Sequence, residues 1–320
     1  DLAESIERER FLQYLFRGQW RELREHCHEK GIHIIGDMPI YVAHDSCDIW
    51  THRELFKLDA EGRPLFVAGV PPDYFSATGQ LWGDPVYDWE ACREGGYEWW
   101  LSRLERTLAV VDTVRIDHFR GLAAYWEIPA GEKTAVNGRW APGPGNDFFE
   151  ALRERFAELP LIAEDLGIIT PDVSELMDRY GLPGMKVLLF AFDESLPRNP
   201  YIPHNHVKNC LVYTGTHDNN TVRGWFEKEA SEADKERLFD YLGRRIGGDE
   251  LPWELARLAL LSVADVAILP LQDLLALGEE GRMNRPSIAL GNWEWRLEKN
   301  RITPECAARL RRLTELSGRS

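Results

Sequence analysis

The sequence lacks the features that mark several common classes of protein. No apolar stretch approaches the ~20 residues of a membrane-spanning helix, and we expect no signal peptide. The five cysteines are scattered without a C-x-x-C pair, which favours reduced thiols in a cytoplasm over a disulfide framework. Lys and Arg number 38 against 53 Asp and Glu, and the formal net charge of −15 opposes binding to nucleic acid or an anionic membrane. We therefore expect a cytoplasmic protein with neither nucleic-acid nor membrane partners.

Short apolar runs alternate along the chain with helical patterns. The runs are rich in Val, Ile and Leu and apolar on both faces, as in buried parallel strands. Six such strands are predicted, at residues 32–36, 110–116, 159–163, 186–192, 210–215 and 265–271. Helices are predicted at residues 2–30, 97–108, 147–156, 171–180, 231–245 and 253–261. This order predicts an α/β fold of the (β/α)₈ type with about six of eight units, the first two being absent.

The segment from Tyr41 to about residue 96 departs from this alternation. Its first fifty residues are rich in Pro, Gly, Asp and aromatic residues and have weak periodicity. A long irregular segment in a packed domain is usually functional or disordered, and the aromatic content favours a functional insertion. Trp50, Trp82 and Trp89 lie in it, and each fits either a packed core or a surface that stacks on sugar rings. We expect residues 1–320 to form one catalytic domain that contains this insertion.

Three acidic residues follow apolar runs and carry the main functional signal. Asp117 lies in VRIDHFRG, Glu164 in LIAEDLG and Asp218 in THDNNT. If these runs are parallel strands of one sheet, the three carboxylates emerge at the same carboxyl edge, where α/β folds place their active sites. Carboxylates grouped in this way, without a reactive cysteine or a phosphate-binding loop, indicate chemistry on a glycosidic bond.

The local surroundings assign a different task to each acid. Arg115 precedes Asp117 by two residues, so on a strand both side chains share a face, and the guanidinium favours the ionised form that a nucleophile needs. Glu164 follows three apolar residues, and burial would raise its pKa as an acid/base catalyst requires. His217 and Asp218 form a pair suited to hydrogen-bonding neighbouring sugar hydroxyls.

Other interpretations of these residues stay open. A single acid at a strand end is more often a helix cap or an ion-pair partner than a catalyst, and only the repetition favours function. His118 with Asp117, and His217 with Asp218, would also fit a metal-dependent hydrolase. No H-x-H motif follows a first strand and no bridging lysine is evident, so we expect neither a metal nor another cofactor.

Several motifs closely resemble those of the 4-α-glucanotransferases, also called amylomaltases or disproportionating enzymes, a branch of the α-amylase superfamily. They span nearly the whole chain from about residue 10 to residue 297. Besides the three acidic motifs they are GDMPIYV at 36–42, GVPPDYFS at 69–76, GQLWG at 79–83, RMN at 282–284 and GNW at 291–293.

The resemblance implies roles for individual residues. Asp117 matches the nucleophile, Glu164 the general acid/base and Asp218 the carboxylate that stabilises the distorted sugar. Substrate-binding positions are Asp37, Arg115, His217 and Asn284, together with Tyr74, Phe75 and Trp82 of the aromatic acceptor-side segment.

The resemblance also implies a reaction and its partners. The implied activity is transfer of α-1,4-glucan segments between maltooligosaccharides, starch or glycogen-derived dextrins through a covalent glucosyl-enzyme. The family carries roughly another third of chain upstream, so we expect this sequence to be a fragment with its catalytic residues present. An α-amylase-like hydrolase and an inactive glucan-binding fragment are the alternatives, which activity on maltotriose would separate.

Overall fold

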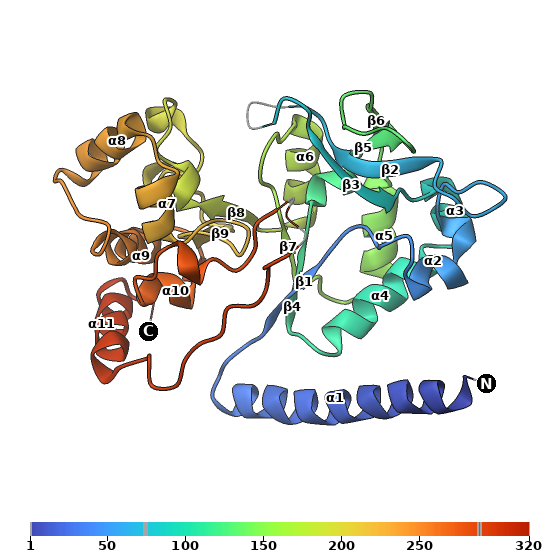
Figure 1. Ribbon diagram of the computed structural model, residues 1–320, viewed down its shortest axis with the longest axis horizontal. Helices are drawn as coiled ribbons and strands as arrows, with labels where there is room; N and C mark the ends of the chain where they lie inside the picture. Colours follow the sequence, from blue (N-terminus) through green and yellow to red (C-terminus); the bar gives the residue numbers. More distant parts are fainter. Residues whose placement is uncertain (1, 73–75, 287, 289, 320) are drawn as a thin grey trace. The chain divides into compact units, whose positions relative to one another are not determined.

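Apolar runs of the sequence form two parallel sheets. The computed structural model describes residues 2–72, 76–286, 288 and 290–319, and contacts group the chain into two units, residues 1–182 and 183–320. The first unit contains a three-stranded parallel sheet in the order β1-β4-β7, and the second contains another in the order β10-β9-β8 (Figure 1). Each unit is considered by itself, and the single domain expected from the sequence stays a prediction.

The first unit contains most of the β-structure. Its strands are β1 (Ile35–Met38), β2 (Phe66–Val70), β3 (Gln80–Pro85), β4 (Thr113–Ile116), β5 (Ala124–Pro129), β6 (Arg139–Pro142) and β7 (Leu161–Ala163). Its helices are α1 (Ala3–Glu29), α2 (Cys47–Thr51), α3 (Trp89–Glu94), α4 (Glu98–Leu108), α5 (Gly145–Arg155) and α6 (Pro171–Tyr180), with short 3₁₀ turns η1 (Arg53–Leu55) and η2 (Phe119–Leu122).

The second unit is mainly helical. Its strands are β8 (Gly184–Val187), β9 (Cys210–Tyr213) and β10 (Val266–Ile268). Its helices are α7 (Val222–Lys228), α8 (Glu232–Leu242), α9 (Leu251–Leu261), α10 (Leu271–Leu274) and α11 (Pro304–Leu316), with 3₁₀ turns η3 (Leu188–Phe190), η4 (Leu196–Arg198), η5 (Pro203–Asn205) and η6 (Glu279–Gly281). None of the helices that the structure describes combines the length and apolarity needed to span a membrane.

Each predicted parallel strand contributes residues to a strand, but several of the predicted ranges are too long. The range 265–271, for example, runs past the end of β10 at Ile268 to the start of α10. The sequence favours a strand over residues 186–192, whereas β8 ends at Val187 and a 3₁₀ turn follows. Leu188 and Leu189 remain buried in that turn, so an apolar run alone does not distinguish a strand from a buried turn. Helix α6 agrees with the prediction at both ends, because Pro171 occupies its first turn and Gly181 ends it in the left-handed conformation.

The segment after β1 contains regular elements that its weak periodicity did not predict. The segment contains β2 and β3, which pair antiparallel and join β5 and β6 in a four-stranded sheet of order β3-β2-β5-β6 (Figure 1). The pairing shifts register between Val67 and Gly69. Gly69 allows β3 to approach closely, because a Cβ there would lie 2.2 Å from the carbonyl oxygen of Gln80.

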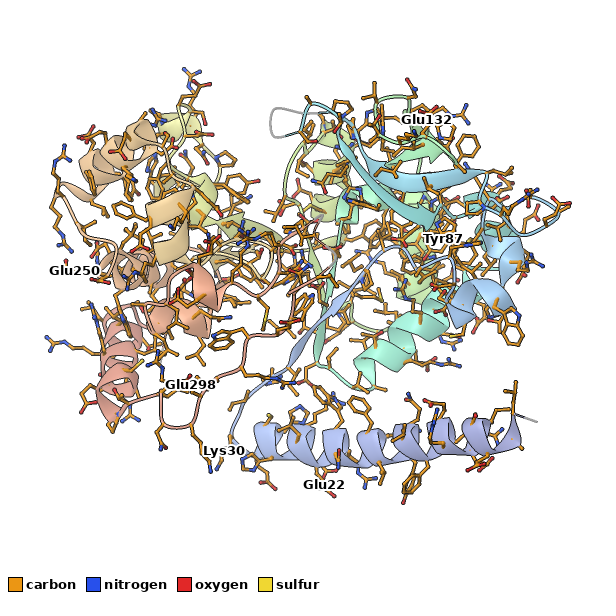
Figure 2. All side chains as sticks on the ribbon, viewed as in Figure 1. Glu22, Lys30, Tyr87, Glu132, Glu250 and Glu298 are labelled. Atoms are coloured by element: carbon orange, nitrogen blue, oxygen red, sulfur yellow. The ribbon has the colours of Figure 1, made fainter. Side chains whose placement is uncertain are left out.

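A large aromatic core lies beneath these sheets in the first unit. Tyr87, which is labelled in Figure 2, is fully buried. Its ring packs against those of Phe56, Trp89 and Trp100, with centroids 4.8–5.3 Å apart. Trp89 therefore belongs to the core rather than to a sugar-stacking surface, while Trp50 is exposed. In the second unit, Trp253, Ala256 and Leu274 form a core cluster where α9 and α10 meet.

Candidate active site

The carboxyl edge of the β1-β4-β7 sheet brings together three acidic residues. Asp37 lies in β1 and is paired in register with Arg115 of β4. Asp117 and Glu164 directly follow β4 and β7, and their backbone N–H groups extend the ladder by donating to the carbonyls of Met38 and Ile116. The prediction that Asp117 and Glu164 lie at the carboxyl edge of one sheet is thus confirmed.

Arg115 joins two of these carboxylates. Its Nη1 atom lies 2.6 Å from Oδ1 of Asp37 and 3.0 Å from Oδ1 of Asp117. The Arg115 side chain is only 8% exposed, whereas both aspartate side chains are 42% exposed. Burial would lower the pKa of Arg115, but the surrounding carboxylates raise it on balance. The guanidinium therefore stays charged, and its contact with Asp117 is the one that the i, i+2 spacing predicts.

Glu164 has a different environment from Asp117. Burial, and then the charge of Asp117, raises the pKa of Glu164 to about 7, against the opposing effect of Arg115. Two backbone N–H groups donate to its carboxylate, from His118 at 2.8 Å and from Leu166 at 3.0 Å. The expected rise in pKa is confirmed, and it lets Glu164 exchange a proton near neutral pH.

The turn after β4 adds a feature that the sequence did not reveal. His118 adopts the left-handed conformation with φ of 50° and begins the 3₁₀ turn η2. Burial and the nearby Arg120 charge lower the pKa of His118 to about 3, so its imidazole is neutral. Trp82 of β3 packs edge-on against this ring at 4.8 Å. These contacts place Trp82 beside the turn that carries Asp117.

Asp218 lies in the second unit, on the segment between β9 and α7. Asn284 Nδ2 donates to its Oδ1 at 2.6 Å, and His217 Nε2 lies 3.5 Å from its Oδ2. The Asn284 backbone N–H donates to the carbonyl of His217. Arg282 adds hydrogen bonds to the carbonyl oxygens of Asp218 and Asn284. The structure thus brings His217, Asp218 and Asn284 into one polar cluster, while its convergence with Asp117 and Glu164 stays a prediction.

A buried carboxylate anchors the segment that bears Asp218. Asp273 is 1% exposed and accepts hydrogen bonds from the Thr214 hydroxyl at 2.6 Å and the Val222 backbone N–H at 2.8 Å. Burial raises the pKa of Asp273 to about 6 despite both donors. Because Thr214 and Val222 flank the segment, Asp273 fixes both of its ends.

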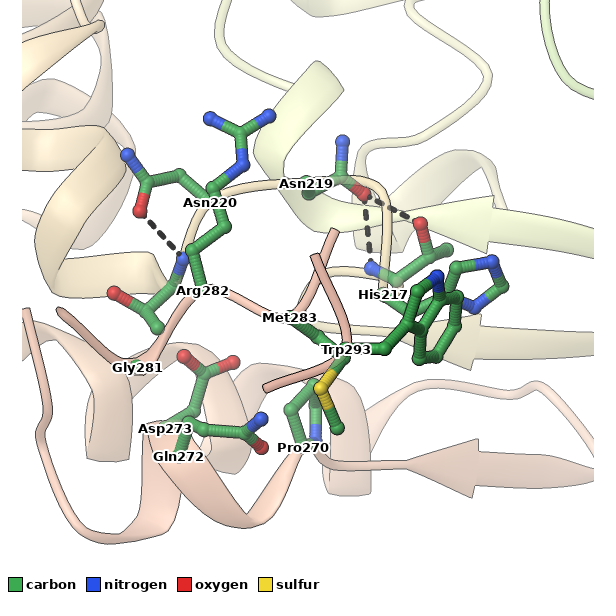
Figure 3. A pocket seen from close by; sticks show the side chains of 12 residues that line it. His217, Asn219, Asn220, Pro270, Gln272, Asp273, Gly281, Arg282, Met283 and Trp293 are labelled. Atoms are coloured by element: carbon green, nitrogen blue, oxygen red, sulfur yellow. Dashed lines mark hydrogen bonds between the residues drawn. The ribbon is translucent and has the colours of Figure 1, made fainter. Parts of the chain in front are cut away.

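A cavity of about 210 Å³ opens beside this cluster (Figure 3). His217 and Trp293 line it with their rings 5.2 Å apart, and Asn219, Arg282 and Asp273 contribute polar groups. Trp293 itself has a φ of 63° and is held by a backbone hydrogen bond to Met283. An aromatic surface beside several hydrogen-bonding groups suits a neutral polyhydroxylated ligand.

Of the other residues that the sequence singled out, the structure describes Trp82 but not Tyr74 or Phe75. Trp82 is half-exposed on β3. Tyr74 and Phe75 lie outside the described residues, so their role stays a prediction. The sequence did not indicate the structural roles of His118 and Asp273, because neither a left-handed backbone nor a buried carboxylate has a distinctive local sequence pattern.

Comparisons with known proteins agree with this arrangement. A glycoside hydrolase family model described as 4-alpha-glucanotransferase matches residues 1–302. The 4-alpha-glucanotransferase of Thermus thermophilus is 51% identical over 99% of this chain and 64% of its own length. That of Synechocystis is 52% identical over 97% of this chain and 61% of its own length.

A solved structure is also very similar. It is an amylomaltase from Streptococcus agalactiae in complex with acarbose, with a TM-score of 0.95 and 41% identity over 100% of this chain and 64% of that chain. The α/β architecture thus has a counterpart in a class of carbohydrate-active enzymes. The chain belongs to the 4-alpha-glucanotransferase family. It spans less than two thirds of the length of these relatives.

Proposed function

We propose that this chain carries the catalytic residues of a 4-α-glucanotransferase that moves α-1,4-glucan segments by retaining double displacement. The observation that carries the proposal is the contrast between the two acids at one sheet edge. Arg115 contacts Asp117 at 3.0 Å, while burial raises the pKa of Glu164 to about 7. One carboxylate is therefore suited to attack and the other to proton transfer.

In the first step, Asp117 attacks the anomeric carbon of the donor glucan. Glu164, protonated at the start, gives its proton to the departing glycosidic oxygen as the bond from that oxygen to the anomeric carbon breaks. A β-linked glucosyl ester forms on Asp117, and Glu164 is left as a carboxylate. The Asp218–His217–Asn284 cluster holds the hydroxyls of the distorted sugar in this step.

In the second step, a glucan acceptor takes the place of the departed segment. Glu164 removes the proton from the 4-hydroxyl of the acceptor, and that oxygen attacks the anomeric carbon of the glucosyl-enzyme. The bond from this carbon to Asp117 breaks, which frees the Asp117 carboxylate and restores an α-1,4 bond. Transfer prevails over hydrolysis when the acceptor excludes water. Tyr74, Phe75 and Trp82 are the residues to which we assign that task, since aromatic faces stack on sugar rings.

The proposal also covers the fold, the substrates and the cellular location of the protein. The fold in this proposal is of the (β/α)₈ type, of which this chain supplies about six of the eight units. The donors and acceptors are maltooligosaccharides and larger α-1,4-glucans, and no cofactor takes part. Five cysteines without a disulfide among the described residues support a cytoplasmic location.

Trapping the ester tests the roles of the two acids. In Glu164→Gln, α-maltosyl fluoride should still react, because fluoride leaves without protonation, and the missing base should make the ester accumulate. Intact-mass spectrometry should find one maltosyl adduct, and peptide mapping should place it on Asp117. Asp117→Asn should give no adduct, and Glu298→Gln, whose side chain is 78% exposed, should turn over as the unmodified protein does. An adduct on any other residue would contradict the assignment.

Product analysis with maltotriose separates transfer from hydrolysis. A transferase should yield longer oligosaccharides, whereas a hydrolase should yield glucose and maltose without them. Tyr74→Ala or Phe75→Ala should lower transfer and raise the hydrolysed share. An unchanged ratio in both variants would remove the aromatic segment from acceptor binding, and retained glucan binding without any product would favour the binding-fragment alternative.

A further inference from the structure

His118 holds a backbone conformation that L-amino acids seldom adopt. Its φ of 50° lies in the left-handed region, where the Cβ of most residues crowds the backbone and where His, Asn and Asp are the side chains found most often. Such strain persists only where the surroundings impose it, and it concentrates at functional sites. The left-handed conformation of His118 therefore calls for a structural reason.

The amide between Asp117 and His118 faces the carboxylate of Glu164. Its N–H donates to Oε2 of Glu164 at 2.8 Å. Rotation about φ of His118 sets the direction of this amide relative to the turn η2 that follows. That turn is fixed, because Phe119 and Leu122 are fully buried and the Gly121 N–H donates to the His118 carbonyl.

The imidazole of His118 is held on two sides. Trp82 packs against it with its ring plane at 89° and a centroid distance of 4.8 Å, a favourable aromatic geometry. Gly121 also leaves room for the ring, since a Cβ there would lie 3.2 Å from Cδ2 of His118. The Nε2 atom is buried and finds no hydrogen-bond partner among the residues that the structure describes. The contacts with Trp82 and the space at Gly121 are thus packing contacts of the ring.

We infer that His118 is a positioning residue for Glu164: its packed side chain holds the left-handed turn that points the Asp117–His118 amide at the Glu164 carboxylate. The inference rests on the proposed function only for the catalytic importance of Glu164. The amide stabilises the ionised form of Glu164, and the same turn carries Asp117. One backbone unit thus sets the direction of both acids.

The surroundings of Glu164 give this inference a measurable consequence. The charged groups that face it are Asp117, which raises its pKa, and Arg115, which lowers it. The N–H donors of Leu166 and His118 also lower the pKa. Loss of the His118 hydrogen bond alone should therefore raise the pKa of Glu164, by about one unit, or tenfold in its ionisation constant.

Two substitutions separate the backbone from the side chain. His118→Gly and His118→Ala both remove the imidazole, but only Gly adopts positive φ without a steric penalty. The Glu164 pKa can be followed by NMR in protein labelled with ¹³C at the Glu carboxyl, with Glu164→Gln to assign the signal. Both variants lack the packed ring, so we expect a midpoint near 7 in the unmodified protein and a midpoint about one unit higher in both variants. A midpoint near 7 in His118→Gly would show that the left-handed backbone suffices without the ring, and a midpoint near 7 in His118→Ala would show that the ring does not hold the turn. Either result would overturn the inference.

The unmodified protein offers a second test that does not depend on variants that fold. The backbone amide signals of His118 and Leu166 should both titrate with the midpoint of the Glu164 carboxyl, because both donate to it. A His118 amide that ignores this titration while Leu166 follows it would overturn the inference. Neither test requires turnover, so a failure of the proposed activity would be seen separately, in the trapping experiment.

Discussion

Asn284 donates its side-chain amide to the Asp218 carboxylate at 2.6 Å, although 66 residues separate the two in sequence. A hydrogen bond to a charged group contributes roughly 1.5–3 kcal/mol, and here it orients the carboxylate from outside the segment that bears it. The contact connects the motif RMN with the motif THD and assigns a concrete task to Asn284.

Replacing Asn284 should therefore impair turnover more than folding. Asn284→Ala should lower kcat/KM about 10- to 100-fold, because the Asp218 carboxylate loses its closest amide donor. Asn137→Ala is the matched control, since Asn137 also donates to a carboxylate, that of Glu132, but in an exposed turn. Steady-state kinetics on maltotriose would measure both variants. Equal effects of the two substitutions would contradict the role assigned to Asn284.

The raised pKa of Glu164 predicts an effect of pH on stability. Its folded-state pKa of about 7 lies above the ordinary value of 4.5. The stabilisation from this tighter proton binding is fully present below pH ~4.5 and is lost as the pH rises through ~7. Glu164→Gln cannot ionise, so relative to the unmodified protein its free energy of unfolding should rise by up to about 3 kcal/mol between pH 4.5 and pH 8.5.

Urea denaturation at the two pH values would measure that difference. Glu298→Gln should show no such change between them, because its side chain is 78% exposed. A constant difference between Glu164→Gln and the unmodified protein at both pH values would mean that Glu164 titrates normally.

The same pKa predicts the alkaline limb of the activity profile. The first step needs protonated Glu164, so kcat/KM should fall tenfold for each pH unit well above about 7. With α-maltosyl fluoride the leaving group needs no proton, so the rate of ester formation should not fall at alkaline pH. Initial rates from pH 5 to pH 9 with maltotriose and with α-maltosyl fluoride would test the prediction. A fall of the rate at the same alkaline pH with both donors would contradict it.

Asp273 should act on stability through its two buried donors. Asp273→Ala should lower the free energy of unfolding by about 2–4 kcal/mol, because the Thr214 hydroxyl and the Val222 N–H lose their acceptor in a buried site. Asp249→Ala, at a side chain 79% exposed, should cost less than about 0.5 kcal/mol. Chemical denaturation would compare them, and an equally small cost in both would show that the network is dispensable.

Glu127 is a buried acidic residue on β5 of the antiparallel sheet. Its side chain is 1% exposed and lies 2.7 Å from both Lys57 and Arg139. Glu127→Ala should destabilise the fold by about 3 kcal/mol, since Lys57 is left partly buried without its carboxylate. Glu61→Ala, which breaks an exposed pair with Arg63, should change stability by less than about 1 kcal/mol. Thermal unfolding of both variants would decide whether burial makes the difference.

Several features of this protein follow from the sequence alone. Parallel strands buried on both faces must be short apolar runs, so β4, β7 and β9 could be located without a structure. The period of two along a strand put Arg115 beside Asp117, and three apolar residues before Glu164 predicted its raised pKa. Pro171 and Gly181 marked the two ends of α6 by their fixed backbone preferences.

Tertiary structure decided the features that depend on residues far apart in the chain. Strands β2 and β3 contain Gly and Pro and look like loops, and they become strands because β2 pairs with β5, almost sixty residues later. Glu127 can be buried only because Lys57 and Arg139 meet it there. The left-handed turn at His118 is tolerated because Trp82 and Gly121 enclose its ring. Local propensity does not encode such contacts, because their free energy appears only when the folded chain brings both partners together.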